Sequence, residues 1–440
     1  MIKQARWYLS AAVIAAGGAV AIGQAEAAGF GLKEQSAEAQ GTSYAGAGAR
    51  ADDPSTLFYN PAGITHLHGY QISLSAAGIF PDGTLASGSA TNTARLPAGG
   101  TTGMNSGVSA FLPSFYATAE INPRLFAGLA VTSPYGLATK YPTSSITRYY
   151  GLTTSLRVIN IGPTLAFKVT PQISVGGGLN IETADAHLSN SVDFGTIGYA
   201  YRIPGLYPGS ADGLGTLKGT DTALGWNLAA LYEPGDDWRI GATYRSAVFH
   251  NLTGTLGYQS VPTYLQAKFQ NAAASAKVPE PSTFSLSAAK DIGPWTALAD
   301  VTYTGWSVFQ NLTVISGGAV TTATAEKFKD TVSVAVGADY RLNDQLTLRG
   351  GVAWDPTPVQ NSYRTPRIAD NDRFWLSIGA TWRPTPNWAI SGAYSHLFAN
   401  NDSVNLTDLG PGTVNYLKGS LSGIYNVSVD IVSAQVTYRF

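Results

Sequence analysis

The sequence predicts an all-β membrane protein: a 14-stranded antiparallel outer-membrane β-barrel with an N-terminal plug (hatch) inside its lumen. Three observations support this fold class. Only 12% of the 440 residues are charged, whereas soluble domains carry about 25%. The mean hydropathy is only +0.02, too low for a bundle of membrane-spanning helices. From residue 69 onward, apolar residues alternate with small or polar residues, and this period of two is that of a strand with one apolar face.

Residues 1–27 have the features of a signal peptide. Lys3 and Arg6 give a positive start, residues 9–22 are apolar, and Ala25-Glu26-Ala27 is a small-x-small cleavage site. We therefore expect Sec-type export, cleavage near Ala27 and location in the bacterial outer membrane. A membrane anchor is the alternative, but the apolar stretch is short for one.

Residues 28–68 are expected to form the plug, and residues 69–440 the barrel. The stretch RADDPSTLFYNPAG, residues 50–63, has no helical or strand period. A fourteen-stranded barrel encloses more volume than its wall side chains fill, and irregular backbone is tolerated at membrane depth when protein surrounds it. The alternative is a disordered periplasmic tail, which the apolar side chains of this segment disfavour: Phe30, Leu32, Leu57, Phe58, Tyr59 and Ile64.

The alternation predicts fourteen strands, near residues 69–80, 107–121, 124–133, 156–170, 172–188, 221–233, 237–249, 281–291, 294–304, 330–342, 344–355, 372–384, 386–397 and 424–440. Every second connection is a tight turn, such as Asn122-Pro123 or Gly293-Pro294, and the others are long. An even strand number with short turns at one end is typical of outer-membrane barrels. In lipid such a sheet has to close. A soluble β-sandwich is the alternative, but it needs neither an export signal nor this rhythm of loops.

The two faces of the predicted wall can be assigned from parity. In DTVSVAVGADYR, Val332, Val334 and Val336 share one face, which we expect to contact lipid, and Thr331 and Ser333 share the other. Apolar faces often end in Trp or Tyr, as in the aromatic girdles of membrane barrels. The chain ends in Phe440, and a terminal aromatic residue resembles the signal read by the barrel-assembly machinery.

Several long segments resemble the FadL family of outer-membrane transporters for long-chain fatty acids and aromatic hydrocarbons. They are AGFGLKEQSAEAQGTSYAGAGARADDPSTLFYNPAGIT, DTALGWNLAALYEPGDDWRIGATYRS, DTVSVAVGADYRLNDQLTLRGGVAWDPTPV and the terminal YRF. The resemblance implies a monomeric barrel whose plug carries an Asn-Pro-Ala motif, here Asn60, Pro61 and Ala62. It also implies that ligand lands on outer loops, reaches an internal site and leaves sideways beside a kink in the third strand, residues 124–133.

Two predicted outer loops are apolar for exposed segments, and apolar surface clusters tend to mark binding sites. The resemblance implies that they form the landing groove; packing of their aromatics against one another is a compatible alternative. Their candidate residues are Tyr199, Tyr201, Ile203, Leu206 and Tyr207 in 196–220, and Val261, Tyr264, Leu265 and Phe269 in 250–280.

By parity, Arg245 and Arg349 point into the lumen. Either could bind a ligand carboxylate, since a buried unpaired charge is costly. The preferred alternative is that they pair with lumen or plug acids, namely Asp300, Asp339, Asp52 or Asp53.

The expected function is passive uptake of hydrophobic small molecules, either long-chain fatty acids or aromatic and aliphatic hydrocarbons. A general or structural porin, or an adhesin, is the alternative. We expect no enzyme activity, because no G-x-S-x-G motif is present. No cofactor and no metal site are expected, since the five histidines show no metal-binding spacing. The even charge distribution argues against nucleic-acid binding.

Overall fold

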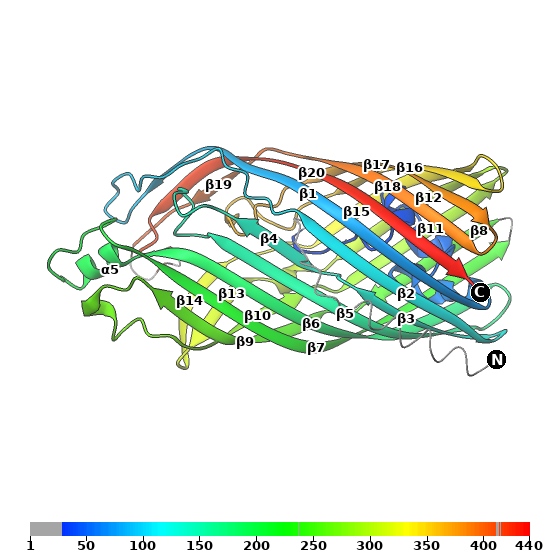
Figure 1. Ribbon diagram of the computed structural model, residues 1–440, viewed down its shortest axis with the longest axis horizontal. Helices are drawn as coiled ribbons and strands as arrows, with labels where there is room; N and C mark the ends of the chain where they lie inside the picture. Colours follow the sequence, from blue (N-terminus) through cyan, green and yellow to red (C-terminus); the bar gives the residue numbers. More distant parts are fainter. Residues whose placement is uncertain (1–28, 236, 411–412, 414) are drawn as a thin grey trace.

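A computed structural model describes residues 29–235, 237–410, 413 and 415–440. The predicted signal peptide, residues 1–27, and the expected mature start at Ala28 lie outside these residues. Fourteen antiparallel strands of the described chain form a closed ring (Figure 1), as predicted. In ring order they are β1 (Tyr70–Thr91), β2 (Ala110–Asn122), β3 (Leu125–Thr132), β5 (Thr153–Lys168), β6 (Ile173–Asp193), β7 (Asp212–Gly235), β8 (Trp238–Arg245), β11 (Thr283–Ile292), β12 (Trp295–Thr304), β15 (Thr331–Arg341), β16 (Leu346–Asp355), β17 (Arg373–Thr385), β18 (Trp388–Ala399) and β20 (Ser420–Arg439).

The ring closes because the first and last strands pair over nearly their whole length. The β1–β20 register runs from Gln71 opposite Arg439 to Thr91 opposite Ser420. The tight turns predicted from the sequence connect neighbouring strands at the end of the barrel where the chain terminates, so the long connections lie at the other end. Within the described residues, no helix has both the length and the apolar character needed to span a bilayer.

The wall rises further on the long-loop side than the sequence predicts. Additional strands continue it there: β4 (Gly136–Lys140), β9 (Val248–Gln259), β10 (Ala272–Glu280), β13 (Asn311–Ser316), β14 (Ala319–Ala325) and β19 (Asp402–Leu406). The segments expected to be loops, 196–220 and 250–280, are therefore largely regular. They contain α5 (Phe194–Ala200), the first part of β7, all but the first two residues of β9, η2 (Thr263–Leu265) and β10. Above the lipid neither face of a strand has to be apolar, so the alternation that identifies the lower strands is absent there.

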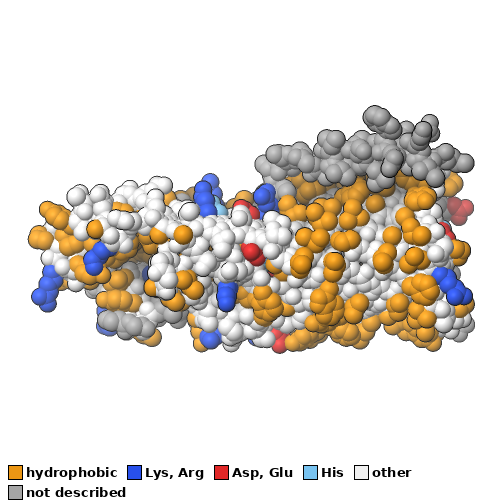
Figure 2. All heavy atoms as spheres, turned by 90° about the horizontal axis from the view of Figure 1, so that it is seen from below, with side chains coloured by type: hydrophobic (Ala, Val, Ile, Leu, Met, Phe, Trp, Pro, Cys, Tyr) orange, Lys and Arg blue, Asp and Glu red, His pale blue; other side chains and the backbone are white. Residues whose placement is uncertain are grey.

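The assignment of the two wall faces is confirmed. Val332 and Val334 are 50% and 44% exposed on the outside of the barrel, whereas Thr331 and Ser333 are buried. Figure 2 shows hydrophobic side chains gathered over the half of the barrel that carries the short turns and the C terminus. Aromatic pairs lie at the short-turn end of the barrel, including Trp295 beside Tyr340, with ring centroids 4.5 Å apart. This band is the surface that hydrocarbon covers.

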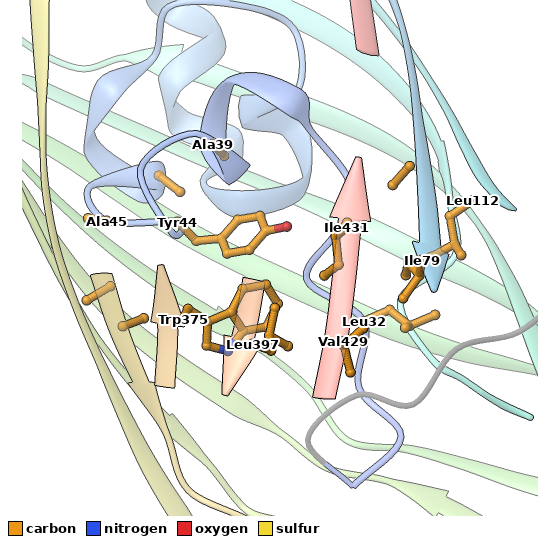
Figure 3. Close-up of a cluster of buried hydrophobic side chains, with 14 of the residues drawn as sticks. Leu32, Ala39, Tyr44, Ala45, Ile79, Leu112, Trp375, Leu397, Val429 and Ile431 are labelled. Atoms are coloured by element: carbon orange, nitrogen blue, oxygen red, sulfur yellow. The ribbon is translucent and has the colours of Figure 1, made fainter. Parts of the chain in front are cut away.

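The N-terminal segment before β1 lies inside the barrel as a plug. It contains α2 (Ala37–Gln40), α3 (Ala47–Arg50), α4 (Thr56–Tyr59) and η1 (Pro61–His66). Each piece is only one or two turns long, because glycines and prolines interrupt the segment. Figure 3 shows Tyr44 of the plug beside Trp375 of the wall, and their rings meet edge to face at 5.7 Å. Apolar contact with the wall, rather than helix propensity, therefore holds these short helices in place.

A further short helix, η3 (Trp306–Val308), separates β12 from β13. The same level of the wall carries two other interruptions. β8 and β9 are separated at 246–247, and β10 and β11 at 281–282. The barrel wall therefore has a belt of broken strands above the plug, and the candidate site lies within this belt.

Candidate ligand path and plug seat

The Asn-Pro-Ala motif fastens the plug to the barrel wall. The buried Asn60 Nδ2 donates to the carbonyl oxygens of Gly48, at 2.6 Å, and of Ala230 in β7, at 3.0 Å. Its Oδ1 accepts from the Ala62 amide at 2.9 Å and so caps η1. Pro61 follows at the first helical position, where its missing N–H costs nothing. One side chain thus joins two plug segments and the wall.

Two wall residues opposite this motif have to be glycines. A Cβ atom added to Gly176 of β6 would lie 2.6 Å from the Ala62 amide nitrogen. A Cβ atom on Gly241 of β8 would overlap the Gly48 carbonyl oxygen. Glycine at both positions lets the plug backbone approach the wall backbone directly.

A network of four buried charged groups forms a second plug contact. Arg349 of the wall donates to plug Glu38 at 2.8 Å and lies 3.5 Å from Asp339. Plug Arg50 lies 2.7 Å from Asp339 and 3.9 Å from Glu38. Two cations thus alternate with two carboxylates, which offsets the cost of burying each charge. Arg349 therefore contacts Asp339, one of the acids named from the sequence, and also Glu38, which was not among them.

The other acids named from the sequence have separate contacts. Asp52 lies 3.2 Å from Arg50 and 3.6 Å from Arg239, and Asp53 accepts from Gln435 at 2.9 Å. Asp300 accepts hydrogen bonds from Ser287 and Thr302.

The third strand is interrupted between β3 and β4, and the plug pairs with the interruption. The Leu32 amide donates to the Pro134 carbonyl at 2.8 Å, and the Gly136 amide donates to the Phe30 carbonyl at 2.9 Å. The Gln35 side chain donates to the Ser133 carbonyl at 2.7 Å and accepts from its amide at 3.2 Å. The plug therefore acts as a short partner strand at this break.

The break leaves one edge of β2 without a regular partner. β2 pairs with β3 only as far as Phe115 opposite Val131, while β4 pairs with β5 from Gly136 opposite Arg157. In the part of the chain that the structure describes, residues 110–114 of β2 have ladder partners on β1 alone. The wall therefore has an interrupted ladder at the level of Ser133 and Pro134.

An outer groove of about 1240 Å³ lies among the long loops. Of the nine loop residues predicted to bind ligand, Phe269 lines it, stacked edge to face on Phe194 at 5.0 Å and on Tyr258 at 5.2 Å. Leu265 is buried, and Tyr199, Tyr201, Tyr207 and Tyr264 are exposed. Ile203, Leu206 and Val261 are half-buried. The structure thus brings one of the nine into the groove.

Most groove residues were missed because they come from strands, from a third loop and from α5. They include Tyr149, Tyr150, Leu188, Ile197, Leu256 and Leu312. The density of tyrosines in residues 141–150 is the sequence signal that points to them.

An inner pocket with about 670 Å³ of empty space continues from the outer groove. The two share Leu188, Leu217, Leu312 and Arg367, so they adjoin. The apolar part of the remaining lining includes Phe30, Leu137, Leu156, Leu252, Ala274, Ala276, Val278 and Phe309. The lining of the pocket is that of a site for a small hydrophobic ligand.

Two buried charged groups line the inner pocket without a direct ion pair. Arg367 donates to Thr154 Oγ1 at 3.2 Å, to Asn190 Oδ1 at 3.3 Å and to two backbone carbonyls. Among the described residues, no carboxylate lies within salt-bridge distance of its guanidinium. Glu326, in the segment between β14 and β15, is buried with neither carboxyl oxygen hydrogen-bonded. Burial raises the pKa of Glu326 to about 8, against the opposing effects of Arg367 and Lys418.

The Phe30 side chain lines the inner pocket, and a second cavity begins at the next residue. That cavity, of about 1130 Å³, is lined by Gly31, Leu32 and Tyr135, among others. The Phe30 ring packs edge to face on Trp306 at 4.8 Å and lies 5.9 Å from Tyr135. A plug side chain thus separates the two cavities.

Arg245 lines this second cavity. It lies over the Phe58 ring at 4.9 Å and 3.8 Å from Glu182.

Comparison with known proteins matches this architecture to one family. Residues 18–440 match the family model described as Outer membrane protein transport protein (OMPP1/FadL/TodX). The chain is 30% identical to a long-chain fatty acid transport protein of Escherichia coli, over 89% of this chain and 91% of that protein. It is also 30% identical to an outer membrane protein of Neisseria meningitidis, over 98% and 99% of the two chains.

Solved structures agree with this assignment. The crystal structure of a Pseudomonas aeruginosa FadL homologue superposes with a TM-score of 0.85 at 26% identity, covering 93% of this chain and 99% of that one. The Ralstonia pickettii toluene transporter TbuX has a TM-score of 0.66 at 18% identity, covering 93% and 99%, and so shows the same fold. The resemblance read from the sequence is confirmed, and the chain belongs to the OMPP1/FadL/TodX family of outer-membrane transport proteins.

Proposed function

We propose that the protein imports long-chain, carboxylate-headed amphiphiles passively across the outer membrane. The observation that carries this proposal is the apolar inner pocket with a buried guanidinium, Arg367, that has no carboxylate partner among the described residues. A ligand carboxylate would supply the missing anion, and the hydrocarbon chain would fill the apolar part. The relatives include long-chain fatty acid transport proteins, and the solved neighbours include toluene transporters.

Burial of hydrocarbon is a sufficient driving force for capture. Each methylene transferred from water contributes about 0.8 kcal/mol, so ten contribute about 8 kcal/mol before association costs. The outer groove would take the chain first, because its Tyr149, Tyr150 and Phe269 rings offer apolar surface outside the membrane. Arg367, which lies where the groove meets the inner pocket, would add the charge interaction as the chain moves inward.

The ligand would leave the inner pocket along the plug, toward the interrupted third strand. Displacement of the Phe30 ring would join the inner pocket to the second cavity, whose lining includes Pro134 and Tyr135 of the interruption. The free edge of β2 lies at this level, so the ligand would leave sideways into the outer-membrane lipid. Transfer into hydrocarbon is downhill, and no energy source is needed.

Further properties belong to the same proposal. The protein would act as a monomer and without enzyme activity or cofactor, surrounded by outer-membrane lipid and apart from nucleic acid. Its exposed terminal Phe440 would be read by the barrel-assembly machinery during insertion. The Asn60, Pro61 and Ala62 motif would hold the plug, while Arg349 and Arg245 would serve the plug and lumen rather than the ligand.

Displacement of a fluorescent fatty acid from the purified barrel tests the proposal. Oleate is expected to displace the probe from the wild type, and R367M should weaken oleate at least about 10-fold, because a charge-assisted contact contributes roughly 1.5–3 kcal/mol. R367K should recover part of the loss. Toluene, which has no charged group, should be unaffected by R367M.

A buried arginine elsewhere provides the matched control. Arg364 is buried and paired with Asp402 at 2.9 Å, and it lines neither the groove nor the inner pocket. R364M should leave oleate binding unchanged. Equal oleate affinity in R367M and the wild type would contradict the proposed ligand class, and toluene displacing the probe better than oleate would favour an aromatic hydrocarbon.

A further inference from the structure

Three potential metal ligands from three strands converge inside the barrel wall. Glu182 of β6, His250 of β9 and Glu280 of β10 are 0%, 1% and 1% exposed. His250 Nε2 lies 3.5 Å from Glu280 Oε1 and 4.0 Å from Glu182 Oε2. One potential ligand atom from each residue lies within 4.8 Å of the other two.

The strand breaks bring these side chains together. In β8 the odd-numbered residues, such as Arg245, face the lumen, whereas in β9 the even-numbered residues, such as His250, do so. The break at 281–282 reverses parity in the same way between β10 and β11. β7 lies between β6 and β9, and here it contributes the small Ala223 and Gly225. A Cβ on Gly225 would lie 2.6 Å from the Val248 side chain.

The polar atoms of this cluster are not satisfied by the described chain. Both carboxyl oxygens of Glu182, both of Glu280, and His250 Nε2 are buried without a hydrogen-bond partner. The nearest cation, Arg245, is 3.8 Å from Glu182. Buried carboxylates are normally paired, hydrogen-bonded or bound to a metal. Two of them this close need a positive species between them or a shared proton.

The imidazole of His250 is held in the orientation of a metal ligand. Its Nδ1 lies 3.2 Å from Asp221 Oδ2, which also accepts the Asn251 amide at 3.1 Å. A carboxylate on one ring nitrogen fixes the tautomer and leaves the lone pair of the other nitrogen free, which is the usual second contact of a metal-bound histidine. Here Nε2 points toward the two glutamates.

We propose that Glu182, His250 and Glu280 bind a divalent first-row transition-metal ion such as Zn²⁺. Zinc binds imidazole nitrogen and carboxylate oxygen at about 2.0–2.2 Å, so neighbouring ligand atoms of a tetrahedral site lie about 3.4 Å apart. The separations of 3.5 and 4.0 Å need only small side-chain movements to reach this geometry. The dication neutralises the two carboxylates, and water completes the coordination.

The ion would act as a structural clamp at a weak place in the wall. Regular β7–β9 pairing ends at Thr220 opposite Thr253, and β7–β8 pairing resumes at Asn227 opposite Arg245. A metal bound by β6, β9 and β10 spans the intervening residues 221–226. Next to Glu280, the Pro281 carbonyl accepts from Tyr135 at 3.1 Å, which connects the clamp to the break in the third strand.

Metal binding to the purified, detergent-solubilised barrel tests this inference independently of transport. After chelator treatment and dialysis against Zn²⁺, the wild type should retain one zinc per chain by mass spectrometry and bind it saturably by calorimetry. X-ray absorption at the zinc edge should show one imidazole among oxygen ligands. H250A and E280Q should weaken zinc binding by about 100-fold or more, and D221N by roughly 10- to 100-fold.

The controls separate this site from other imidazoles and from misfolding. His66 pairs with Glu233 at 2.9 Å at the short-turn end, so H66A should bind zinc like the wild type. Heat-modifiable migration on gels shows whether each variant is folded. If H250A does not fold, D221N still tests the site, because it keeps all three metal ligands. Absence of stoichiometric zinc from the wild type would overturn the inference and leave a proton shared by the two glutamates. Wild-type zinc affinity in E280Q and D221N would overturn it as well.

Discussion

Substitution of Asn60 by alanine should loosen the plug without disturbing the barrel. The change removes two hydrogen bonds to buried carbonyls, on Gly48 and Ala230, and the cap that Asn60 Oδ1 provides to the Ala62 amide. Each intramolecular hydrogen bond contributes about 1 kcal/mol net, and loss of a helix cap also costs about 1 kcal/mol. The docked state of the plug should therefore be destabilised by about 3 kcal/mol. A change of this size increases the population of barrels with a displaced plug by a factor on the order of 100.

Single-channel recording in planar bilayers measures this population directly. The wild type should conduct rarely, because the plug fills the lumen, whereas N60A should open far more often. Asn371 provides the matched control, since it is equally buried and its Nδ2 donates to the Asn400 carbonyl at 2.9 Å, a contact in which no plug residue takes part. N371A should lower thermal stability yet keep the wild-type opening frequency. A folded N60A barrel with wild-type conductance would refute the role given to this side chain.

Three further variants test the path and its charges. F30A should join the inner pocket to the second cavity and raise the rate of fatty-acid uptake into proteoliposomes; a lower rate would show that the ring guides ligand instead of blocking it. Q35A removes the paired hydrogen bonds to Ser133, and hydrogen exchange of the Ser133 amide should accelerate, while an unchanged rate would show that the break is rigid without the plug. Because burial raises the pKa of Glu326 from 4.5 to about 8, the folded protein keeps a proton that the unfolded chain releases. The stability that this carboxyl group contributes is therefore fully present below about pH 4.5 and is lost as the pH rises toward 8. The thermal unfolding midpoint of the wild type should therefore fall as the pH rises from about 5 to 7, before Lys418, whose pKa burial lowers to about 8, begins to lose its proton. E326Q should show a flatter profile, and identical profiles would contradict this.

The wall of the barrel could be predicted from local pattern. Val332 and Thr331 belong to opposite faces because successive strand residues alternate, and lipid requires the apolar set outside. The turns at Asn122-Pro123 and Gly293-Pro294 follow from residues that end strands. The strand number, the plug and the Asn60 motif follow from the same local information and from resemblance.

The inner site could be predicted only in part. Arg349 faces the lumen as its parity requires, but its contact with Glu38 depends on where the plug packs. Of the loop residues chosen for apolar character, Phe269 lines the groove, while Tyr264 is exposed. Arg367, which lines the inner pocket, lies in a loop with no periodic pattern that would indicate its direction.

The closed wall and its two faces follow from the amino-acid sequence alone, because strand period, turn residues and the absence of water in hydrocarbon are local constraints. The places where that period is interrupted depend on how the folded chain packs. Extrapolated from Arg245, strict alternation would place His250 on the outer face of the wall, yet the break at 246–247 turns it inward beside Glu182 and Glu280. A shift of one residue moves every following side chain of the strand to the opposite face of the wall. Such a shift is set by packing between strands that are distant in the sequence.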